Sequence, residues 1–244
     1  MNKFKTKDGK DGFVVYAHRG ASHYCPENTL MSFYMGVRLG ANGIETDVQR
    51  TKDGVLVLFH DDTLDRVTGF CGAVSDYTYE QLCRMYVKEH GLFDRIPTLE
   101  DFLDRFAFRD ITLALELKVG GMEADIRALL YKYGMAERTV VTSFNLDYLK
   151  AFKVCAPEIR IGYLTVRTDG EVAGLLKELG AYEICPKGEL LTPELVKEWH
   201  GKGLNVRAWG IFNTDIMKNV YDAGADGMTV NFPDLLIEYI NGKK

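Results

Sequence analysis

The sequence contains no long apolar run and no excess of basic charge. No stretch approaches the roughly 18 consecutive apolar residues that a membrane-spanning helix needs, so we expect no stable insertion into a membrane. The formal net charge is −5 at pH 7, which argues against nucleic acid as a partner, because nucleic-acid binding needs a basic footprint. Residues 1–12 are polar and lack the apolar segment of a signal peptide, so we expect none there.

The sequence also lacks paired cysteines. Its five cysteines are odd in number, widely spaced and without a CxxC motif, so they support neither a zinc site nor a disulfide framework. Reduced thiols are typical of the cytoplasm, and we therefore expect a cytoplasmic location. Cys25 lies close to the pair His18-Arg19, but a lone cysteine there is weak support for a nucleophile.

Strand-like and helix-like segments alternate along the chain from residue 13. Eight β-rich stretches are each followed by a segment with helical spacing of its apolar residues. Eight such units in 244 residues favour a closed TIM (β/α)8 barrel of the α/β class, as one domain over residues 1–244, over an open doubly wound sheet. No GxGxxG follows the first strand, which argues against dinucleotide binding. The expected strands are 13–17, one starting at 43, 111–117, 139–143, 160–164, 182–185, 205–209 and 227–230; the expected helices are 30–39, 99–106, 122–133, 146–154, 171–179, 193–200, 214–223 and 233–240.

Several of these helices start at residues that cap helices well. Asn28 or Thr29 would cap the first helix. Thr98, with Asp101 three residues later, forms an acidic variant of the capping box. Thr192 precedes a proline at the first helical position.

The stretch from Gly43 to Asp62 combines two acids, a turn and a histidine. Glu45 and Asp47 are two residues apart, so in a strand both side chains point to the same face. Asp53-Gly54 then predicts a hairpin turn, after which an apolar strand, 55–59, leads to His60. A half-buried hairpin with solvated acids is the structural alternative. Residues 61–96 form a long connection, with a possible short helix near 80–85, which we expect to be an insertion that carries function or forms a lid.

Acids and histidines follow several of the expected strands. The carboxyl ends of parallel barrel strands meet on one face, where barrel enzymes place their active sites. Glu45, Asp47 and Glu116 would make an all-oxygen site for Mg²⁺ or Ca²⁺. The alternative is that Glu116 only pairs with Lys118. His18 and His60 would serve as general base and general acid, unless they are structural.

Cationic and aromatic residues follow the same strands. Arg19 and Lys118 are placed to hold an anion such as a phosphate, or else only balance the carboxylates. Phe144 and Trp209 are either an apolar wall for a substrate or plain barrel packing, and the sequence leaves both open. A cation, two basic side chains and two histidines suit phosphoryl transfer.

These motifs together resemble the glycerophosphodiester phosphodiesterase family. The resemblance rests on AHRGASHYCPENTLMSF, GIETDVQRTKDGVLVLFHDDTLDRVTG, IPTLEDFL, LALELK and DGMTVNFP, which span nearly the whole chain in the family's order. It implies a TIM barrel with a small insertion after the second strand, at about 61–96. It also implies hydrolysis of a small-molecule glycerophosphodiester to glycerol 3-phosphate and an alcohol, with a divalent cation and sometimes a cyclic intermediate.

The resemblance assigns roles to individual residues. His18 and His60 match the acid–base pair, and Arg19 and Lys118 match the phosphate contacts. Asn231 departs from the pattern, because many relatives have aspartate there. The residues that match the family's metal ligands are Glu45, Asp47 and Glu116.

Other functions remain open from the sequence alone. A phospholipase D-like relative would act on lysophospholipids and would need an apolar rim on the segment after His60. A non-catalytic barrel would bind phosphodiesters without turning them over. An enolising metal enzyme fits the acids but not the two histidines. The sequence indicates no oligomeric state.

Overall fold

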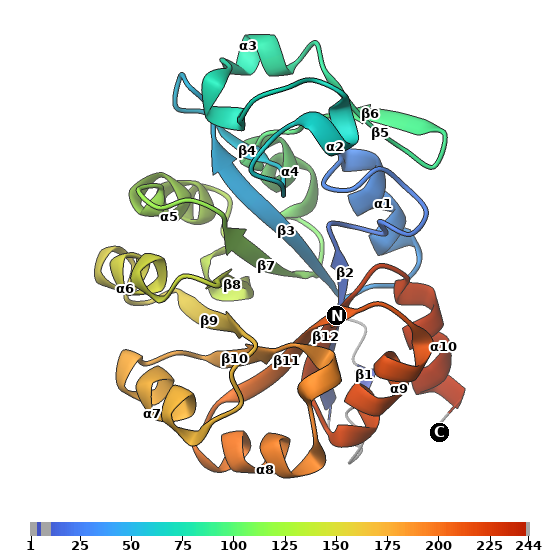
Figure 1. Ribbon diagram of the computed structural model, residues 1–244, viewed down its shortest axis with the longest axis vertical. Coiled ribbons are helices and arrows are strands. Elements are labelled where there is room, and N and C mark those ends of the chain that lie inside the picture. Colours follow the sequence, from blue (N-terminus) through green and yellow to red (C-terminus); the bar gives the residue numbers. More distant parts are fainter. Residues whose placement is uncertain (1–3, 6–10, 243–244) are drawn as a thin grey trace.

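The computed structural model describes residues 4–5 and 11–242, and within them parallel strands close into a barrel (Figure 1). Each barrel strand pairs in parallel with the next, and the last pairs with the first, so the sheet has no open edge there. The predicted TIM (β/α)8 barrel is confirmed. The barrel strands of the described chain are, in ring order, β2 (Asp11–His18), β3 (Gly43–Arg50), β7 (Thr112–Leu117), β8 (Thr139–Ser143), β9 (Arg160–Thr165), β10 (Glu183–Pro186), β11 (Asn205–Ile211) and β12 (Gly227–Val230).

Helices lie outside the ring of strands and cover it (Figure 1). Their bounds agree with the expected ones within two residues, because the apolar spacing and the caps mark them clearly. None of the described helices has the length and hydrophobicity that crossing a bilayer requires. The covering helices are α1 (Leu30–Arg38), α4 (Leu99–Phe106), α5 (Glu123–Lys132), α6 (Leu146–Cys155), α7 (Gly170–Leu179), α8 (Pro193–Gly201), α9 (Thr214–Ala223) and α10 (Pro233–Gly242).

The expected caps form, with one choice resolved. Thr29, not Asn28, caps α1 by accepting a hydrogen bond from the backbone of Ser32. Thr98 and Asp101 form the predicted capping box at α4. Asn28 is left in the left-handed region, at φ 54°, and its side chain turns to the barrel mouth instead.

A hairpin follows the carboxyl end of strand β3. The strand extends to Arg50, and the chain turns at Gly54, whose φ of 90° suits glycine. Strand β4 (Leu56–Leu58) then returns antiparallel to β3. The predicted hairpin therefore forms, and its second strand brings His60 back toward the barrel mouth.

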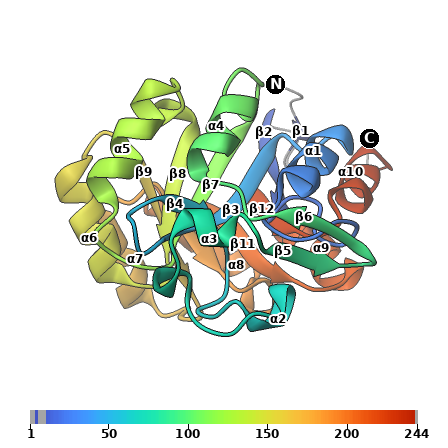
Figure 2. The same ribbon diagram turned by 90° about the horizontal axis from the view of Figure 1, so that it is seen from above.

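The segment after His60 is more ordered than a long irregular connection. It contains α2 (Asp65–Thr68), α3 (Tyr79–Leu82) and an antiparallel pair, β5 (Tyr86–Glu89) and β6 (Leu92–Arg95). Figures 1 and 2 show these elements gathered on one side of the barrel, near α1. Hydrogen bonds hold β5–β6 against the β2–α1 loop and the first turn of α1. Glu89 accepts from the backbone N–H of Glu27 in the loop, and Asp94 accepts from that of Met31 in α1.

The insertion has a small hydrophobic core of its own. The barrel and its helices share one large core, whereas a second cluster lies beneath the insertion. Burial of this second cluster holds the segment in place, because each buried aliphatic side chain contributes about 1.5–3 kcal/mol. Its buried members are Val57, Phe59, Leu64, Val67, Val74, Leu82, Met85, Val87 and Ile96.

A buried ion pair lies inside the barrel, below the mouth. Arg207, only 2 % exposed, donates from Nε to Glu183 at 2.8 Å and from Nη1 to Thr229 at 2.8 Å. Its guanidinium also lies over the ring of Tyr16, 5.1 Å from the centroid. These contacts leave neither charge unpaired in the interior.

We expect Arg207→Ala to lower the free energy of unfolding by about 3–5 kcal/mol, because it leaves the Glu183 carboxylate buried without a cation. Urea denaturation would measure this. Arg127→Ala is the matched control, since Arg127 forms an exposed pair with Glu158, and its midpoint should not move. Equal stability of the two variants would contradict the prediction.

Candidate active site

A pocket of about 230 Å³ lies at the carboxyl ends of the barrel strands. Seven of the nine predicted site residues line it, and the other two, Asp47 and Lys118, contact residues that do. The structure thus brings all nine together from six strands, namely five barrel strands and β4, and from the loops that follow them. The lining residues are His18, Arg19, Glu45, His60, Glu116, Phe144, Leu164, Arg207, Trp209, Gly210, Phe212 and Thr229.

Three carboxylates converge at one side of this pocket. The parallel register of β3 and β7 sets Asp47 opposite Glu116, and Glu45 precedes Asp47 by two residues on the same face. All three residues are buried, and one carboxylate oxygen from each lies within 4.8 Å of the other two. Ile44 and Val48 point the other way, into the core between barrel and helices, as the alternation predicts.

The protonation of these acids reflects how little water reaches them. Burial, and then the neighbouring Asp47, raises the pKa of Glu45 to about 8 and that of Glu116 to about 7. Burial also opposes ionisation of Asp47, but Arg19, His60 and Lys118 outweigh it and hold its pKa below the usual range. The neighbouring cations Arg19 and Lys118 therefore do not neutralise all three acids of the cluster.

The donor set fits a divalent cation. Asp47 Oδ1 is buried and has no hydrogen-bond partner among the described residues, although the other oxygen of this carboxylate accepts from Asn28. A buried carboxylate oxygen without a donor is costly unless a cation meets it. Mg²⁺ and Ca²⁺ prefer such oxygen ligands.

Lys118 both pairs with Glu116 and belongs to the cluster. Its Nζ lies 2.9 Å from Glu116 Oε1 and 3.9 Å from Asp47 Oδ1. The simple Glu116–Lys118 pair considered from the sequence therefore exists, but it stands within the carboxylate group and does not replace it.

His18 ends β2 and is held by Asn231, which follows β12. The ring Nδ1 lies 2.5 Å from Asn231 Oδ1, so Nδ1 carries the proton and donates to the amide oxygen. Its Nε2 is 3.9 Å from Glu45 Oε2. Burial, and then the charge of Arg19, lowers the pKa of His18 to about 4, so the ring is neutral at pH 7. Because Asn231 stands where many relatives have aspartate, His18 Nδ1 meets an acceptor here that carries no charge.

His60 reaches the mouth from the returning strand β4. Its Nδ1 lies 2.6 Å from Asp61 Oδ1. Gln49 holds this segment by donating from Nε2 to the carbonyls of Phe59 and Asp61. His60 therefore lines the pocket from the segment after β4, whereas His18 lines it from the end of β2.

Arg19 lies beside the carboxylates in a constrained backbone conformation, at φ 53°. Its Nη1 donates to both oxygens of Glu27 at 3.0 Å, and its Nε is 3.4 Å from Asp47 Oδ2. The side chain is 14 % exposed, so its charge acts in a poorly solvated place.

Sequence reasoning missed the role of Asn28, which it considered only as a helix cap. Asn28 Nδ2 donates to Asp47 at 2.9 Å, and Thr46 Oγ1 donates to Asn28 Oδ1 at 2.7 Å. It also missed Glu27. Both belong to the Pro26-Glu27-Asn28-Thr29 stretch, and the signal available in the sequence was that this stretch lies within the motif AHRGASHYCPENTLMSF.

The opposite side of the pocket is apolar. The rings of Phe144 and Trp209 meet edge to face with centroids 4.9 Å apart, and Trp209 Nε1 donates to the Thr165 carbonyl at 3.4 Å. Phe144 is 45 % exposed, so the pair forms a pocket wall rather than interior packing. Leu164 and Phe212 extend this wall.

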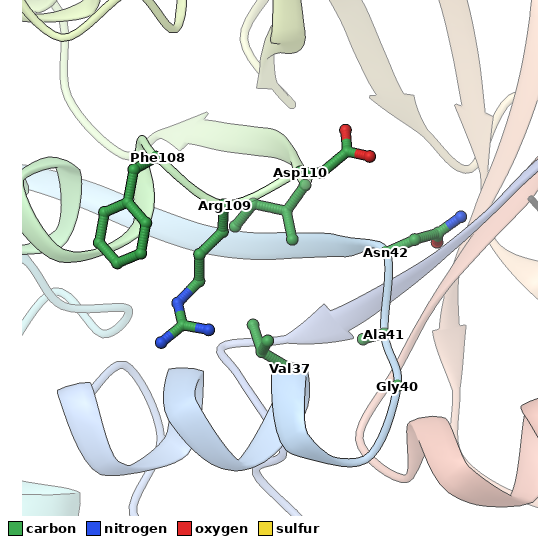
Figure 3. A pocket seen from close by; sticks show the side chains of 8 residues that line it. Val37, Gly40, Ala41, Asn42, Phe108, Arg109 and Asp110 are labelled. Carbon is green, nitrogen blue, oxygen red and sulfur yellow. The ribbon is translucent and has the colours of Figure 1, made fainter. Parts of the chain in front are cut away.

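A larger depression, of about 450 Å³, lies at the other end of the barrel (Figure 3). Figure 3 shows Arg109 extending toward the side of Val37, while the Asp110 carboxylate points away from it. Its lining contains neither histidine nor more than one acid, so the mouth is the better candidate for a catalytic site despite the smaller volume there.

Residues 18–235 match the model of the glycerophosphoryl diester phosphodiesterase family. The chain belongs to this family. The motif-based assignment, including the assignment to an enzyme family, is thereby confirmed.

Curated relatives share the family over almost their whole length. The chain is 34% identical to a glycerophosphodiester phosphodiesterase of Caldanaerobacter subterraneus subsp. tengcongensis, over 93% of this chain and 97% of that protein. The chain is 33% identical to a glycerophosphodiester phosphodiesterase of Bacillus altitudinis, over 92% of this chain and 96% of that protein.

Solved structures share the barrel. A phosphodiesterase of Oleispira antarctica, in complex with the product sn-glycerol-3-phosphate, superposes with a TM-score of 0.83 at 26% identity, covering 93% of this chain and 96% of that one. A glycerophosphodiester phosphodiesterase of Parabacteroides distasonis gives a TM-score of 0.82 at 28% identity, covering 96% and 99%.

We expect Asn28→Asp to destabilise the cation-free protein by about 1–3 kcal/mol at pH 7, because a carboxylate replaces the amide that donates to Asp47. The difference should shrink at acidic pH, where a protonated carboxyl again donates. Asn145→Asp is the control, since Asn145 caps α6 and an acid is tolerated there. Denaturant unfolding at both pH values would test this, and a loss of the same size at both would contradict it.

Proposed function

We propose that this protein hydrolyses glycerophosphodiesters to glycerol 3-phosphate and an alcohol, in a reaction that depends on a divalent cation and on His18 and His60. The observation that carries the proposal is the placement of these two histidines, from separate segments, around one buried carboxylate cluster with Arg19 beside it. The product in the Oleispira antarctica relative supports glycerol 3-phosphate as the product here.

Glu45, Asp47 and Glu116 would hold the cation, which we propose is Mg²⁺ or Ca²⁺. When bound, it supplies positive charge that polarises the phosphoryl group and neutralises the charge of the transition state. Arg19 and Lys118 add fixed positive charge at the same place, where they would contact the phosphate oxygens.

His18 and His60 would move the two protons of the reaction. An oxygen nucleophile, either water or the glycerol 2-hydroxyl, forms a bond to phosphorus while the bond from phosphorus to the alcohol oxygen breaks. Attack by water gives glycerol 3-phosphate directly, whereas attack by the 2-hydroxyl gives a cyclic phosphate, in which water must then form a bond to phosphorus while the bond from phosphorus to the 2-oxygen breaks. One histidine accepts the proton of the attacking oxygen, and the other donates a proton to the leaving oxygen. In each ring Nδ1 faces a partner, Asn231 or Asp61, so Nε2 is the atom free to act.

Hydrolysis of lysophospholipids is a second candidate, favoured by one observation. This candidate needs an apolar rim, and exposed apolar side chains lie beyond β8, β9 and β11, where Phe144, Val166 and Phe212 are 45 %, 61 % and 65 % exposed. The segment after His60 also exposes Phe70 and Phe93. Such a rim suits an acyl chain, whereas the polar head would still occupy the charged side of the pocket.

A cytoplasmic location is consistent with the cysteines and remains part of the proposal. All five thiols are free, and Cys71 is exposed, which suits a reducing compartment.

We expect His18→Ala and His60→Ala each to reduce the release of glycerol 3-phosphate from glycerophosphocholine by about 10²–10⁴-fold, since each removes a proton-transfer group. The assay would include glycerophosphoethanolamine, lysophosphatidylcholine and chelator, with His200→Ala as the control because His200 pairs with Asp226 away from the pocket.

The outcomes separate the candidates. Chelator-sensitive release lost in both site variants supports the proposal, while turnover of lysophosphatidylcholine alone favours the second candidate. Binding without turnover of any substrate would indicate a non-catalytic barrel.

We expect Mg²⁺ or Ca²⁺ at 100 times its Kd to stabilise the protein by about 2.7 kcal/mol, because it binds only the folded site. Asp47→Asn should abolish this gain, while Asp125→Asn, at an exposed pair with Arg50, should retain it. Thermal unfolding with and without chelator measures both. Stabilisation that persists in Asp47→Asn would place the cation elsewhere.

A further inference from the structure

The insertion delivers one arginine to the edge of the site. Arg66, in α2, lies between two carboxylates from different parts of the chain. Its Nη2 donates to Glu27 Oε1 at 2.5 Å, and its Nε donates to Asp61 Oδ2 at 2.5 Å. A third carboxylate, Glu89 of β5, lies 3.6 Å from Nη1.

Besides Arg66, each of these two carboxylates also contacts a side chain to which the proposed function gives a role. Glu27 accepts both hydrogen bonds from Nη1 of Arg19, and Asp61 faces Nδ1 of His60. One unbroken chain of contacts therefore runs from Arg19 through Glu27, Arg66 and Asp61 to His60. Arg66 is its central link.

The charges explain why this link matters. Glu27, Asp61 and Glu89 gather within reach of one guanidinium, and their side chains are only 11 %, 23 % and 23 % exposed. Burial would raise the pKa of Asp61, but hydrogen bonds from Arg66 and His60 outweigh it and lower that pKa to about 2. Without Arg66, the three acids would repel one another and move apart.

The backbone around Arg66 is built to hold it there. The flanking Leu64 and Val67 are buried in the insertion's own core, and α2 ends at Gly69 in the left-handed conformation. Helix α2 is thus anchored on both sides of Arg66, so the guanidinium position is set by the fold of the insertion.

We propose that Arg66 is a positioning residue for the reaction, which orients His60 through Asp61 and Arg19 through Glu27. This inference rests on the proposed function, in which those two side chains move a proton and contact phosphate. The planar guanidinium of arginine donates hydrogen bonds to two carboxylates at once in a fixed geometry, which the single ammonium of lysine does not.

The test compares Arg66→Met, Arg66→Lys and the control Arg84→Met with the wild type on glycerophosphocholine at saturating cation. Arg84 belongs to the same insertion but forms only an exposed pair with Glu80. We expect kcat to fall about 100-fold in Arg66→Met, because displacement of a catalytic group by about 1 Å costs that much. KM should rise as Arg19 is released, Arg66→Lys should recover part of the loss, and Arg84→Met should match the wild type.

Two readouts distinguish positioning from a general structural role. Added guanidinium should partly restore the rate of Arg66→Ala, since the Arg66 side chain is 47 % exposed and its place is open to solvent, and it should not restore His60→Ala. The loss from Arg66→Met should also be much smaller in an Asp61→Asn background, because the two changes break the same link.

The results separate this inference from the proposed function. Wild-type inactivity on every glycerophosphodiester overturns the function and this inference with it. An active wild type with a fully active Arg66→Met overturns the inference alone. The inference is also overturned if guanidinium does not raise the rate of Arg66→Ala and if Arg66→Met loses as much activity in the Asp61→Asn background as in the wild type.

Discussion

Three carboxylates buried together at the ends of β3 and β7 are the constraint on which the rest of the site depends. Such a group is stable only where cations or donors surround it, because buried negative charges repel and lose their hydration. Arg19, Lys118 and Asn28 all point toward Asp47. The left-handed backbone at Arg19 and Asn28 follows from this demand, since it turns both side chains into the mouth.

The insertion extends the same charge balance outward. The β2–α1 loop contributes Glu27, whose carboxylate pairs with Arg19, and the insertion contributes Arg66, which pairs with the same carboxylate. Its own hydrophobic core makes this possible, because a short helix without tertiary packing would not hold an arginine in place. The long connection therefore acts as a structural support of the site, fastened to the barrel by Glu89 and Asp94.

The pocket is divided into a charged half and an apolar half, and the division follows the barrel strands. Strands β2, β3 and β7, with β4, and the residues directly after them supply the histidines, the three acids, Arg19 and Lys118, while β8, β9 and β11 supply Phe144, Leu164 and Trp209. The remaining lining cation, Arg207 of β11, is paired with Glu183. A phosphodiester has a charged centre with two organic substituents, so one half suits the phosphate and the other suits a substituent. This division agrees with membership of the family.

The sequence by itself determined the barrel and the helix bounds, and it named nine candidate site residues that the fold brings together, because period, caps and strand-end motifs are local signals. It could not choose between Asn28 and Thr29 as the cap, decide whether Phe144 and Trp209 form a wall, or reveal Glu27 and Arg66. Those outcomes depend on which side chains from distant segments meet. Only the tertiary structure decided them, because the contacts from Arg19 to His60 pass through an insertion whose position is set by packing rather than by any local pattern.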